Sequence, residues 1–467
     1  MINVGRIWLL ISVRHFLCIV SLLLAGFIPV QAQSILRDAE TEAFLRELTN
    51  PIFRAANMAP NSIQLGLIHD NSINAFAAGG TSIYLHSGLW MAADDVGELR
   101  GVLAHEAGHI AGRHYSRTRD AYQTAGMTSI VSMVLGAAAV LAGGGDAGMG
   151  LIMAGQGMAQ GQVLAYSRAQ ESTTDQAGAS YLDDIGVSGK GMISFFEKLR
   201  SQEILAQVRQ DPYMRSHPLN STRIMNLRDI LEKSEHWDKP VEPDLNEKFL
   251  RLKAKLAGYL QPPSRTLKQY PLTDTSISAR YARVYAYHKA LEWDLALAEA
   301  DALIALEPDN AYFYEIKGQI LFENGRVEEA LPVLEKAVQT APQEPLIMTA
   351  LGQALVSQEN LDWMARAVPI LEDAVRLDRS NSFAWFNLAR AYSWLEQDGD
   401  AALATAERFY SVGAAHLALG HARKAMQEFK EGTPKWLRAQ DILFVSEEAA
   451  AKILKQQRRQ RRAAVVH

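Results

Sequence analysis

Cysteine is almost absent from this chain. Its 467 residues contain a single cysteine, Cys18, in an apolar stretch near the N-terminus. A disulfide needs two cysteines, so the chain cannot form one within itself. We expect the segment that holds Cys18 to be removed. Any metal site of the mature chain must therefore use histidine and carboxylate ligands instead of thiolates.

An excess of basic residues is also absent. The chain has 47 Lys and Arg against 52 Asp and Glu, a formal net charge of -5 at pH 7. Nucleic-acid binding requires a basic face that neutralises phosphates, so we expect no nucleic-acid partner. With 48% hydrophobic and 21% charged residues, the composition is that of a folded protein. The length predicts two or three domains at about 150 residues each.

Residues 1–32 have the features of a secretory signal peptide. Arg6 and Arg14 precede an apolar run at residues 16–30, and the small residue Ala32 ends the segment. This arrangement predicts export and cleavage after residue 32. The alternative is an uncleaved membrane anchor, for which the run is short, because a membrane-spanning helix needs about 20 apolar residues.

Charged residues are missing from most of the region 120–166. None occurs between Asp120 and Asp146 or between Asp146 and Arg168, and glycines occupy positions 143–145. We expect a helical hairpin whose arms are each about long enough to cross a bilayer. Gly, Gln, Ser and Thr dilute both arms, which favours a hairpin that is buried or touches a membrane surface. A true membrane span is the alternative.

The most informative motif lies in residues 102–114, VLAHEAGHIAGRH. His105, Glu106 and His109 form the pattern HExxH on a run with helical periodicity. On a helix with 3.6 residues per turn, the two histidines share one face and can bind one metal ion. Glu106 would lie beside the open coordination position, where a carboxylate can accept a proton from water. The alternative is a helix with two ordinary surface histidines and a solvated glutamate.

A catalytic metal site usually has three protein ligands, so the histidines need a partner from elsewhere. Glu171 is our candidate, because it follows the uncharged hairpin, whose second arm returns to where the first began. Asp175 is one turn further on the same helix face, where it can accept the free N–H of a ligating histidine. Without the HExxH motif, an ordinary solvated helix face would explain both residues better.

The region 33–262 is predicted to form one domain in a mainly α-helical protein. Three extended runs, at residues 62–68, 73–78 and 81–85, predict a small antiparallel β-meander. Helices are predicted at residues 35–58, 98–114, 166–186, 189–205 and 247–260. A loop at 211–223 surrounds His217. Pairs of prolines at 240 and 243 and at 262 and 263 mark the expected domain boundary.

Residues from about 277 onward repeat with a period of 34. This spacing separates Pro308 from Pro342, Gly318 from Gly352 and Leu321 from Leu355. It is typical of tetratricopeptide repeats, and we expect four repeats or slightly more in 263–440. Stacked repeats form a concave surface that suits an extended polypeptide. An irregular helical bundle is the alternative. Residues 441–467 are predicted to be a C-terminal helix with a basic, solvated tail, to which an anionic lipid or acidic partner would be attracted.

Three motifs in order resemble a known family. They are HEAGH at 105–109, SRxxExxxD at 167–175 and SHPxxxxR at 216–223, followed by the repeats. Together they resemble the periplasmic β-barrel assembly-enhancing proteases, of the zinc metallopeptidase family that also contains the CAAX-processing and heat-shock membrane proteases. The resemblance implies a zincin-type α+β metalloprotease domain with an α-helical repeat solenoid. It implies one zinc ion per chain at His105, His109 and Glu171, with Glu106 as catalytic base.

The family pattern ExxAD is altered in this chain, because Glu171 is followed by Ser172, Thr173 and Thr174 before Asp175. The aspartate keeps its spacing, so the change concerns the packing of that helix. The resemblance also implies a role as an endopeptidase and chaperone-like factor for misfolded or unassembled outer-membrane proteins. The location would be the periplasm of a Gram-negative bacterium, with the repeats bound to the outer-membrane β-barrel assembly machinery. A repeat-based chaperone or scaffold with a latent metal site is the alternative.

His217 has three interpretations at this point. It could act as an electrophile toward the oxyanion, or occupy the fourth position on zinc until substrate displaces it, or be a structural turn residue. The substrate is expected to bind as an added strand along residues 75–78, which are flanked by Gly79 and Gly80.

Overall fold

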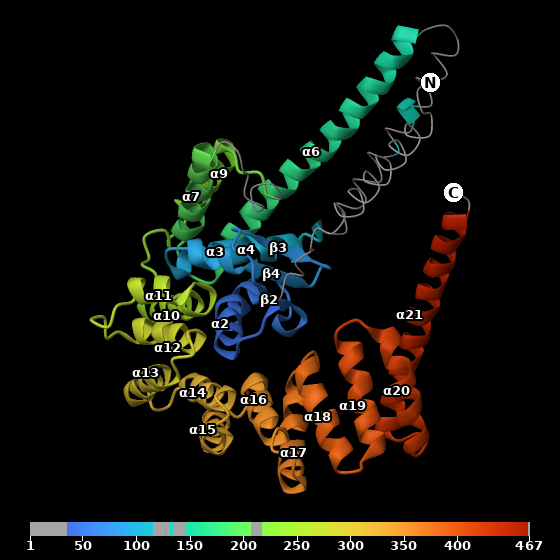
Figure 1. The fold of residues 1–467 in the computed structure, drawn as a ribbon. Coiled ribbons are helices and arrows are strands. Elements are labelled where there is room, and N and C mark those ends of the chain that lie inside the picture. The colour runs from blue at the N-terminus through green and yellow to red at the C-terminus, as the bar shows by residue number, and fades with distance from the viewer. Residues whose placement is uncertain (1–34, 115–126, 128–130, 134–144, 207–216, 466–467) are drawn as a thin grey trace, which may run out of the picture.

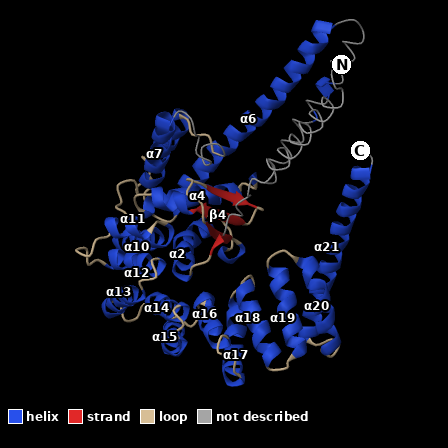
Figure 2. Cartoon of the chain, in the orientation of Figure 1, coloured by secondary structure: helices blue, strands red, loops and turns tan. Residues whose placement is uncertain are grey.

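The computed structural model describes residues 35–114, 127, 131–133, 145–206 and 217–465. The predicted signal peptide and most of the first arm of the predicted hairpin lie outside these residues. The chain forms an N-terminal part that surrounds a small sheet, and a curved row of helices from α12 to α21 (Figure 1). Helices predominate in both parts, as the sequence predicts, and the strands are confined to the N-terminal part (Figure 2).

The sheet has four strands, in the order β1-β2-β4-β3. They are β1 (Ile35–Leu36), β2 (Gln64–Ile68), β3 (Ala75–Ala78) and β4 (Ser82–His86). β3 and β4 form an antiparallel hairpin through residues 79–81, and the positive φ angles of Gly79 and Gly80 suit this tight turn. β2, however, pairs with β4 in parallel. The predicted antiparallel meander is therefore wrong, and the sheet is mixed.

The loop between β2 and β3 explains this difference. It is held against the start of α3 (Ser87–Ala92), where the Ser87 hydroxyl and the Gly88 N–H both donate to the Asp70 carbonyl, at 2.9 and 2.8 Å. A Cβ atom at Gly88 would lie 2.2 Å from the Asn71 carbonyl oxygen, so only glycine permits this approach. After β2, the chain therefore crosses the end of β4, and β3 pairs with the edge of β4 that faces away from β2. The alternation of apolar residues in a sequence shows which face of a strand is buried, but it does not show which strands pair with each other.

Helix α4 (Val96–Ala111) lies at the centre of the N-terminal part. Asp95 caps its first turn by accepting from the Glu98 N–H at 2.9 Å, and Glu98 in turn accepts from the Asp94 N–H. Apolar side chains from α4, the sheet and the surrounding helices form one core. Those helices are α2 (Ala39–Ala55), α6 (Gly145–Asp184), α7 (Lys190–Ala206), α9 (Ser221–Leu231) and α10 (Pro243–Leu260).

Helix α6 joins two elements that the sequence predicts separately, the return arm of the hairpin and the helix 166–186. Its C-terminal part packs on α4, whereas its N-terminal part extends away from the body of the molecule (Figure 1). Among the described residues, no helix is both long and apolar enough to cross a membrane.

The row of helices that follows consists of antiparallel pairs. A second core extends from α12 to α19, and smaller apolar clusters join α19, α20 and α21. After α11 (Pro263–Gln269), the pairs are α12 (Ile277–Lys289) with α13 (Trp293–Leu306), α14 (Ala311–Glu323) with α15 (Val327–Thr340), α16 (Pro345–Val356) with α17 (Leu361–Leu377), α18 (Ser382–Trp394) with α19 (Asp398–Ser411), and α20 (Ala415–Glu428) with α21 (Pro434–Val465). Gly318 and Gly352, which occupy equivalent positions in two repeats, both allow a leucine of the next helix to pack closely. A Cβ atom at Gly318 would meet Leu334 at 2.5 Å, and one at Gly352 would meet Leu371 at 2.4 Å.

The start of α2 is buried against the repeats and α10. Glu40 accepts a hydrogen bond from the Tyr281 hydroxyl at 2.8 Å and pairs with Arg251 at 2.7 Å and with Lys255 at 3.3 Å. Lys255 also lies 2.5 Å from Asp38. The predicted linker helix 247–260 is thus α10, which contributes to the first core and also packs on α12. The predicted boundary at residue 262 stays a prediction.

A cavity of about 320 Å³ lies between this segment and the helices α14, α16 and α18. Its lining includes Asp38, Glu315, Gln319, Thr349 and Gln353. Burial raises the pKa of Glu315, the positive charge of Lys255 opposes this, and the nearby carboxylates of Asp38 and Glu344 add to it, which brings the pKa to about 8. The repeats therefore hold a carboxyl group that prefers its neutral form in the fold.

We expect this carboxyl group to make the stability of the protein fall as the pH rises. Its folded-state pKa lies above the ordinary glutamate value of 4.5, so its contribution to stability is complete below about pH 4.5 and is lost as the pH rises through about 8. Between about pH 5 and pH 9, the free energy of unfolding of the wild type should fall by at least about 1 kcal/mol more than that of Glu315→Gln. Chemical denaturation at each pH measures this. The exposed variant Glu329→Gln is the control, and parallel curves for Glu315→Gln and the wild type would refute the expectation.

Candidate metal centre

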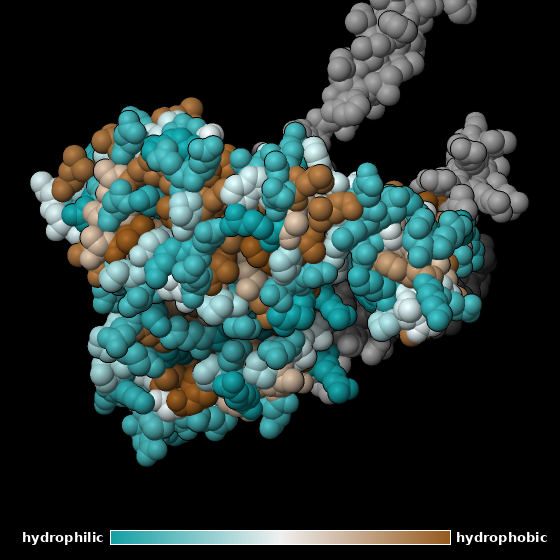
Figure 3. Space-filling view, turned by 90° about the horizontal axis from the view of Figure 1, so that it is seen from below, coloured by the Kyte–Doolittle hydropathy of each residue, from teal (hydrophilic) through white to brown (hydrophobic). Residues whose placement is uncertain are grey.

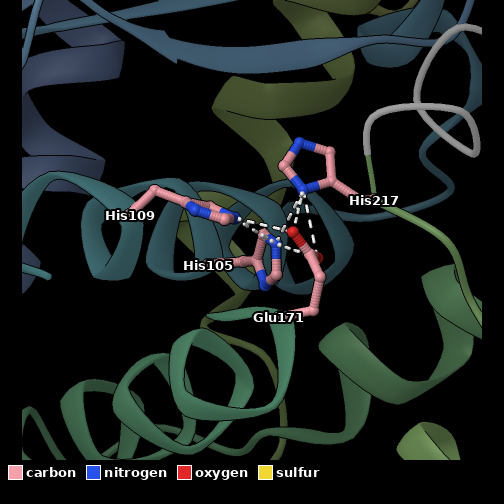
Figure 4. Close-up of side chains that lie close together, drawn as sticks. All are labelled: His105, His109, Glu171 and His217. Atoms are coloured by element: carbon pink, nitrogen blue, oxygen red, sulfur yellow. Dashed lines mark hydrogen bonds and ion pairs between the residues drawn. The ribbon is translucent and has the colours of Figure 1, made fainter. Parts of the chain in front are cut away.

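His105 and His109 point from one face of α4 into the interior (Figure 4). Their Nε2 atoms lie 3.1 Å apart, and His105 has no exposed surface. The spacing of four residues produces this convergence, as the sequence predicts. Two lone pairs that face each other at this distance need a proton or a cation between them.

Helix α6 brings Glu171 to the same point (Figure 4). One carboxylate oxygen lies 3.4 Å from His105 Nε2, and the other lies 3.4 Å from His109 Nε2. The close approach of α6 to α4 depends on Gly178. A Cβ atom there would lie 3.2 Å from the backbone of Ala104 and His105, which is tighter than ordinary contact.

His217 completes the group from the chain that leads into α9. Its Nδ1 atom lies 3.2 Å from Glu171 Oε1 and 3.3 Å from His105 Nε2. Asn220, which follows shortly after, caps α9 by accepting from the Arg223 N–H at 2.9 Å. The cap fixes the direction of the chain between His217 and Arg223.

The four side chains fit a divalent cation. In a tetrahedral zinc site, bonds of about 2.0–2.1 Å place the ligand atoms about 3.3 Å from one another. The measured spacings between the ligand atoms of His105, His109, Glu171 and His217 run from 3.1 to 3.4 Å where neighbours are in contact, and all lie within 4.8 Å. Nitrogen and carboxylate oxygen are also ligands that zinc accepts.

The electrostatics of the site also favour a central cation. Burial would lower the pKa of His105, but its hydrogen bonds to Asp175 and Glu171 outweigh burial and raise the pKa to about 9. The pKa of His109 falls to about 2, because burial and the positive charges of His105 and His217 act together. A proton can be bound to only one of these two imidazoles at a time, whereas a metal ion between them can be coordinated by both.

Asp175 lies on the outer side of His105, with its carboxylate 3.0 Å from Nδ1. Arg223 donates from Nε and Nη2 to both Asp175 oxygens at 2.8 Å, and its Nη1 lies 3.0 Å from Glu171. Burial would raise the pKa of Asp175, but the hydrogen bonds of His105 and Arg223 keep it below its usual value. The guanidinium thus holds two carboxylates in place behind the ligand atoms.

Glu106 has no exposed surface. Neither of its carboxylate oxygens has a hydrogen-bond partner among the described residues. His217 Nε2 lies 3.5 Å away, so this ring stands between Glu106 and the other three ligand candidates. A buried carboxylate without hydrogen bonds is costly, and such groups are concentrated at functional sites.

The structure thus brings together every site residue that the sequence predicts, while two further residues have no predicted role. Arg223 is part of the third motif, and its fixed distance of six residues from His217 is a signal for a shared site. His114 ends the HExxH segment, with Nδ1 3.0 Å from His109 Nδ1. It lies five residues after His109 and beyond the end of α4, so no helical spacing in the sequence indicates this contact.

Comparison with known proteins agrees with this geometry. Residues 38–231 match the model of peptidase family M48, and residues 281–345 match a tetratricopeptide-repeat model. The chain carries an M48 metalloprotease domain followed by tetratricopeptide repeats. All four residues of the metal-binding group lie within the matched M48 region.

Relatives align with this chain over much of its length. The β-barrel assembly-enhancing protease of Yersinia pestis is 25% identical over 330 residues, 69% of this chain and 66% of the relative. The protein of the same name from Escherichia coli strain K12 is 23% identical over 406 residues, 85% of this chain and 81% of the relative. Among solved structures, the repeat protein YrrB covers 49% of this chain at 16% identity, with a TM-score of 0.25.

We expect Arg223→Met to destabilise the M48 domain by about 3–5 kcal/mol, because it leaves two buried carboxylates without their cation. Arg228→Met is a matched control on the same helix, since Arg228 pairs with Glu197 at the surface. The control should change stability by less than about 0.5 kcal/mol. Denaturation curves measure the stability of the two variants, and metal content after dialysis shows whether each variant still holds its metal ion. Equal stability of the two variants would show that Arg223 does not support the site.

Proposed function

We propose that this protein is a zinc-dependent endopeptidase that cleaves misfolded or stalled outer-membrane proteins in the periplasm. The observation that carries the proposal is the convergence of four candidate ligand atoms within 4.8 Å of one another, beside the buried carboxylate of Glu106 and within an M48 domain. In this proposal, His105, His109 and Glu171 hold one zinc ion. Asp175 fixes His105 through its Nδ1 atom.

Zinc would supply Lewis-acid polarisation of a water molecule and of the substrate carbonyl. Glu106 accepts the proton of the attacking water and then delivers it to the nitrogen of the leaving amine. Burial excludes bulk water from this carboxylate, so its interactions with the reacting groups are stronger than they would be at the surface. The oxygens of Glu106 suit this task, because none of the described residues forms a hydrogen bond with them.

The substrate would bind in extended form along β3, the edge strand beside β4. β3 also contacts α4, so a strand added at this edge would pass near the metal-binding face. Backbone pairing at a sheet edge depends little on side chains. Such binding suits an enzyme that acts on many unfolded sequences.

His217 would keep the site closed until substrate displaces it. Its ring lies between Glu106 and the other ligands, at the position where a water molecule would be activated. Of the three interpretations that the sequence left open, this contact favours the fourth ligand.

The repeats would bind the polypeptide substrate or the outer-membrane assembly machinery. The names of the relatives connect those proteins with β-barrel assembly. In this chain, the cavity between α2 and the repeats is lined by amide, hydroxyl and carboxyl groups and by apolar side chains such as Ile316, Phe322 and Leu334. This mixture suits both the backbone and the apolar side chains of an extended polypeptide. On the face seen in Figure 3, hydrophilic residues predominate and hydrophobic residues form small groups, so a partner would meet a mixed surface.

The second candidate is a repeat-based chaperone or scaffold with a latent metal site. The position of His217 favours it, because the ring fills the space that a reacting water needs. The two candidates differ in whether Glu106 is required.

Glu106→Gln should lower the cleavage of an unfolded outer-membrane protein by at least about 100-fold, because the variant loses the general base. Metal content and substrate binding should be unchanged. Glu47→Gln, an exposed residue on α2, is the control. Complete rescue of the cellular role by Glu106→Gln, with cleavage abolished, would support the scaffold instead.

His217→Ala should increase the rate of cleavage, because it vacates the position in front of Glu106. A time course with the same unfolded substrate measures the change. Loss of cleavage would show that His217 is an electrophile, and an unchanged rate would reduce it to a structural turn residue.

A further inference from the structure

His114 lies against the outer side of His109, away from the metal-binding group. Its side chain is buried, and its Nδ1 atom lies 3.0 Å from His109 Nδ1. The two rings meet edge to face, with centroids 5.1 Å apart at 80°. This geometry aims one imidazole nitrogen directly at the other.

The direction of this hydrogen bond follows from the chemistry of imidazole. A neutral histidine that offers Nε2 to a metal carries its proton on Nδ1. His109 Nδ1–H must then donate to an acceptor, and His114 Nδ1 occupies that place. The proton of His114 is consequently on its Nε2 atom.

Thr174 steadies His114 from helix α6. Its hydroxyl donates to the Gln170 carbonyl at 2.8 Å, and the hydroxyl oxygen lies 3.1 Å from His114 Nδ1, whose single lone pair already accepts from His109. Position 174 is where the chain departs from the alanine of the family pattern. The departure therefore places a hydroxyl group beside the partner of His109.

Gly112 leaves the space that the His114 ring needs. A Cβ atom at Gly112 would lie 2.4 Å from His114 Nε2 and 2.8 Å from two other ring atoms. The φ angle of Gly112 is -71°, which any residue adopts. Alanine at this position would thus displace the ring without straining the backbone.

Each metal-binding histidine then has its own support. Asp175 faces His105 Nδ1 at 3.0 Å, and His114 faces His109 Nδ1 at the same distance. Groups of this kind fix the tautomer and orientation of a ligating imidazole, and their loss typically weakens metal binding 10–100-fold.

We propose that His114, steadied by Thr174, is a positioning residue that accepts the Nδ1–H of His109 and so presents His109 Nε2 to the metal ion. The proposal rests on the proposed function, in which His109 is a ligand. It adds a residue outside the three motifs to the machinery of the site.

The test is a zinc titration of the metal-free full-length protein against a competing chelator. His114→Leu should weaken zinc binding about 10–100-fold. His114→Asn should stay within about threefold of the wild type, because its side-chain oxygen can lie near the former Nδ1 position and accept the same proton. Thr174→Val should weaken binding by less than His114→Leu, and Thr174→Ser should bind like the wild type.

The absorption spectrum of the cobalt(II) form provides a second readout. Misplacement of His109 in His114→Leu should change the bands that report ligand geometry, whereas His114→Asn should keep them. If His114→Leu does not fold, Gly112→Ala replaces it, because the added methyl group displaces the same ring. Melting of the metal-free proteins separates loss of folding from loss of binding.

Equal zinc affinity of His114→Leu and the wild type would overturn the proposal. Equal weakening in His114→Leu and His114→Asn would also overturn it, because packing instead of a hydrogen bond would then be responsible. His109→Ala distinguishes failure of the proposed function. If His109→Ala binds zinc as well as the wild type, the metal site itself is rejected. If His109→Ala loses zinc binding but His114→Leu keeps it, only the role of His114 is rejected.

Discussion

The close packing of α6 on α4 is the contact on which the site depends. It brings Glu171 to the two histidines of the HExxH motif, and Gly178 provides the space for it. The ion pair between Arg223 and Asp175 then joins α9 to the same place. Three helices that are far apart in the sequence thus fix one group of ligand atoms. Without this packing, each motif would be an ordinary stretch of polar helix.

The repeats are attached to the metalloprotease domain through charged groups that are buried. Glu40, at the start of α2, contacts Tyr281 of the first repeat helix and two cations of α10. At the surface, the exposed side chain of Arg37 reaches Asp378 after α17 at 2.7 Å. Removing one member of such a network leaves its partners buried and unpaired. The N-terminal segment therefore couples the stability of the domain to the arrangement of the repeats.

The features that the sequence predicts are those that depend on local periodicity. The pairs His105 with His109 and Glu171 with Asp175 each span four residues, so one helix face carries both members. The 34-residue period reveals the repeats for the same reason. Strand neighbours and the continuity of α6 depend on packing between distant segments, whereas the contact of His114 with His109 depends on the turn after α4, where Arg113 has a positive φ angle. No spacing in the sequence records these contacts, which explains why the antiparallel meander was expected and a mixed sheet was found.

The central claim is that His105, His109 and Glu171 hold one zinc ion. Anomalous diffraction at the zinc absorption edge, from crystals of the full-length protein, tests it most directly. We expect one peak per chain, about 2.0–2.1 Å from the Nε2 atoms of both histidines and about 2.0–2.2 Å from the Glu171 carboxylate. The absence of a peak at this position, or zinc bound only elsewhere in the chain, would contradict the claim.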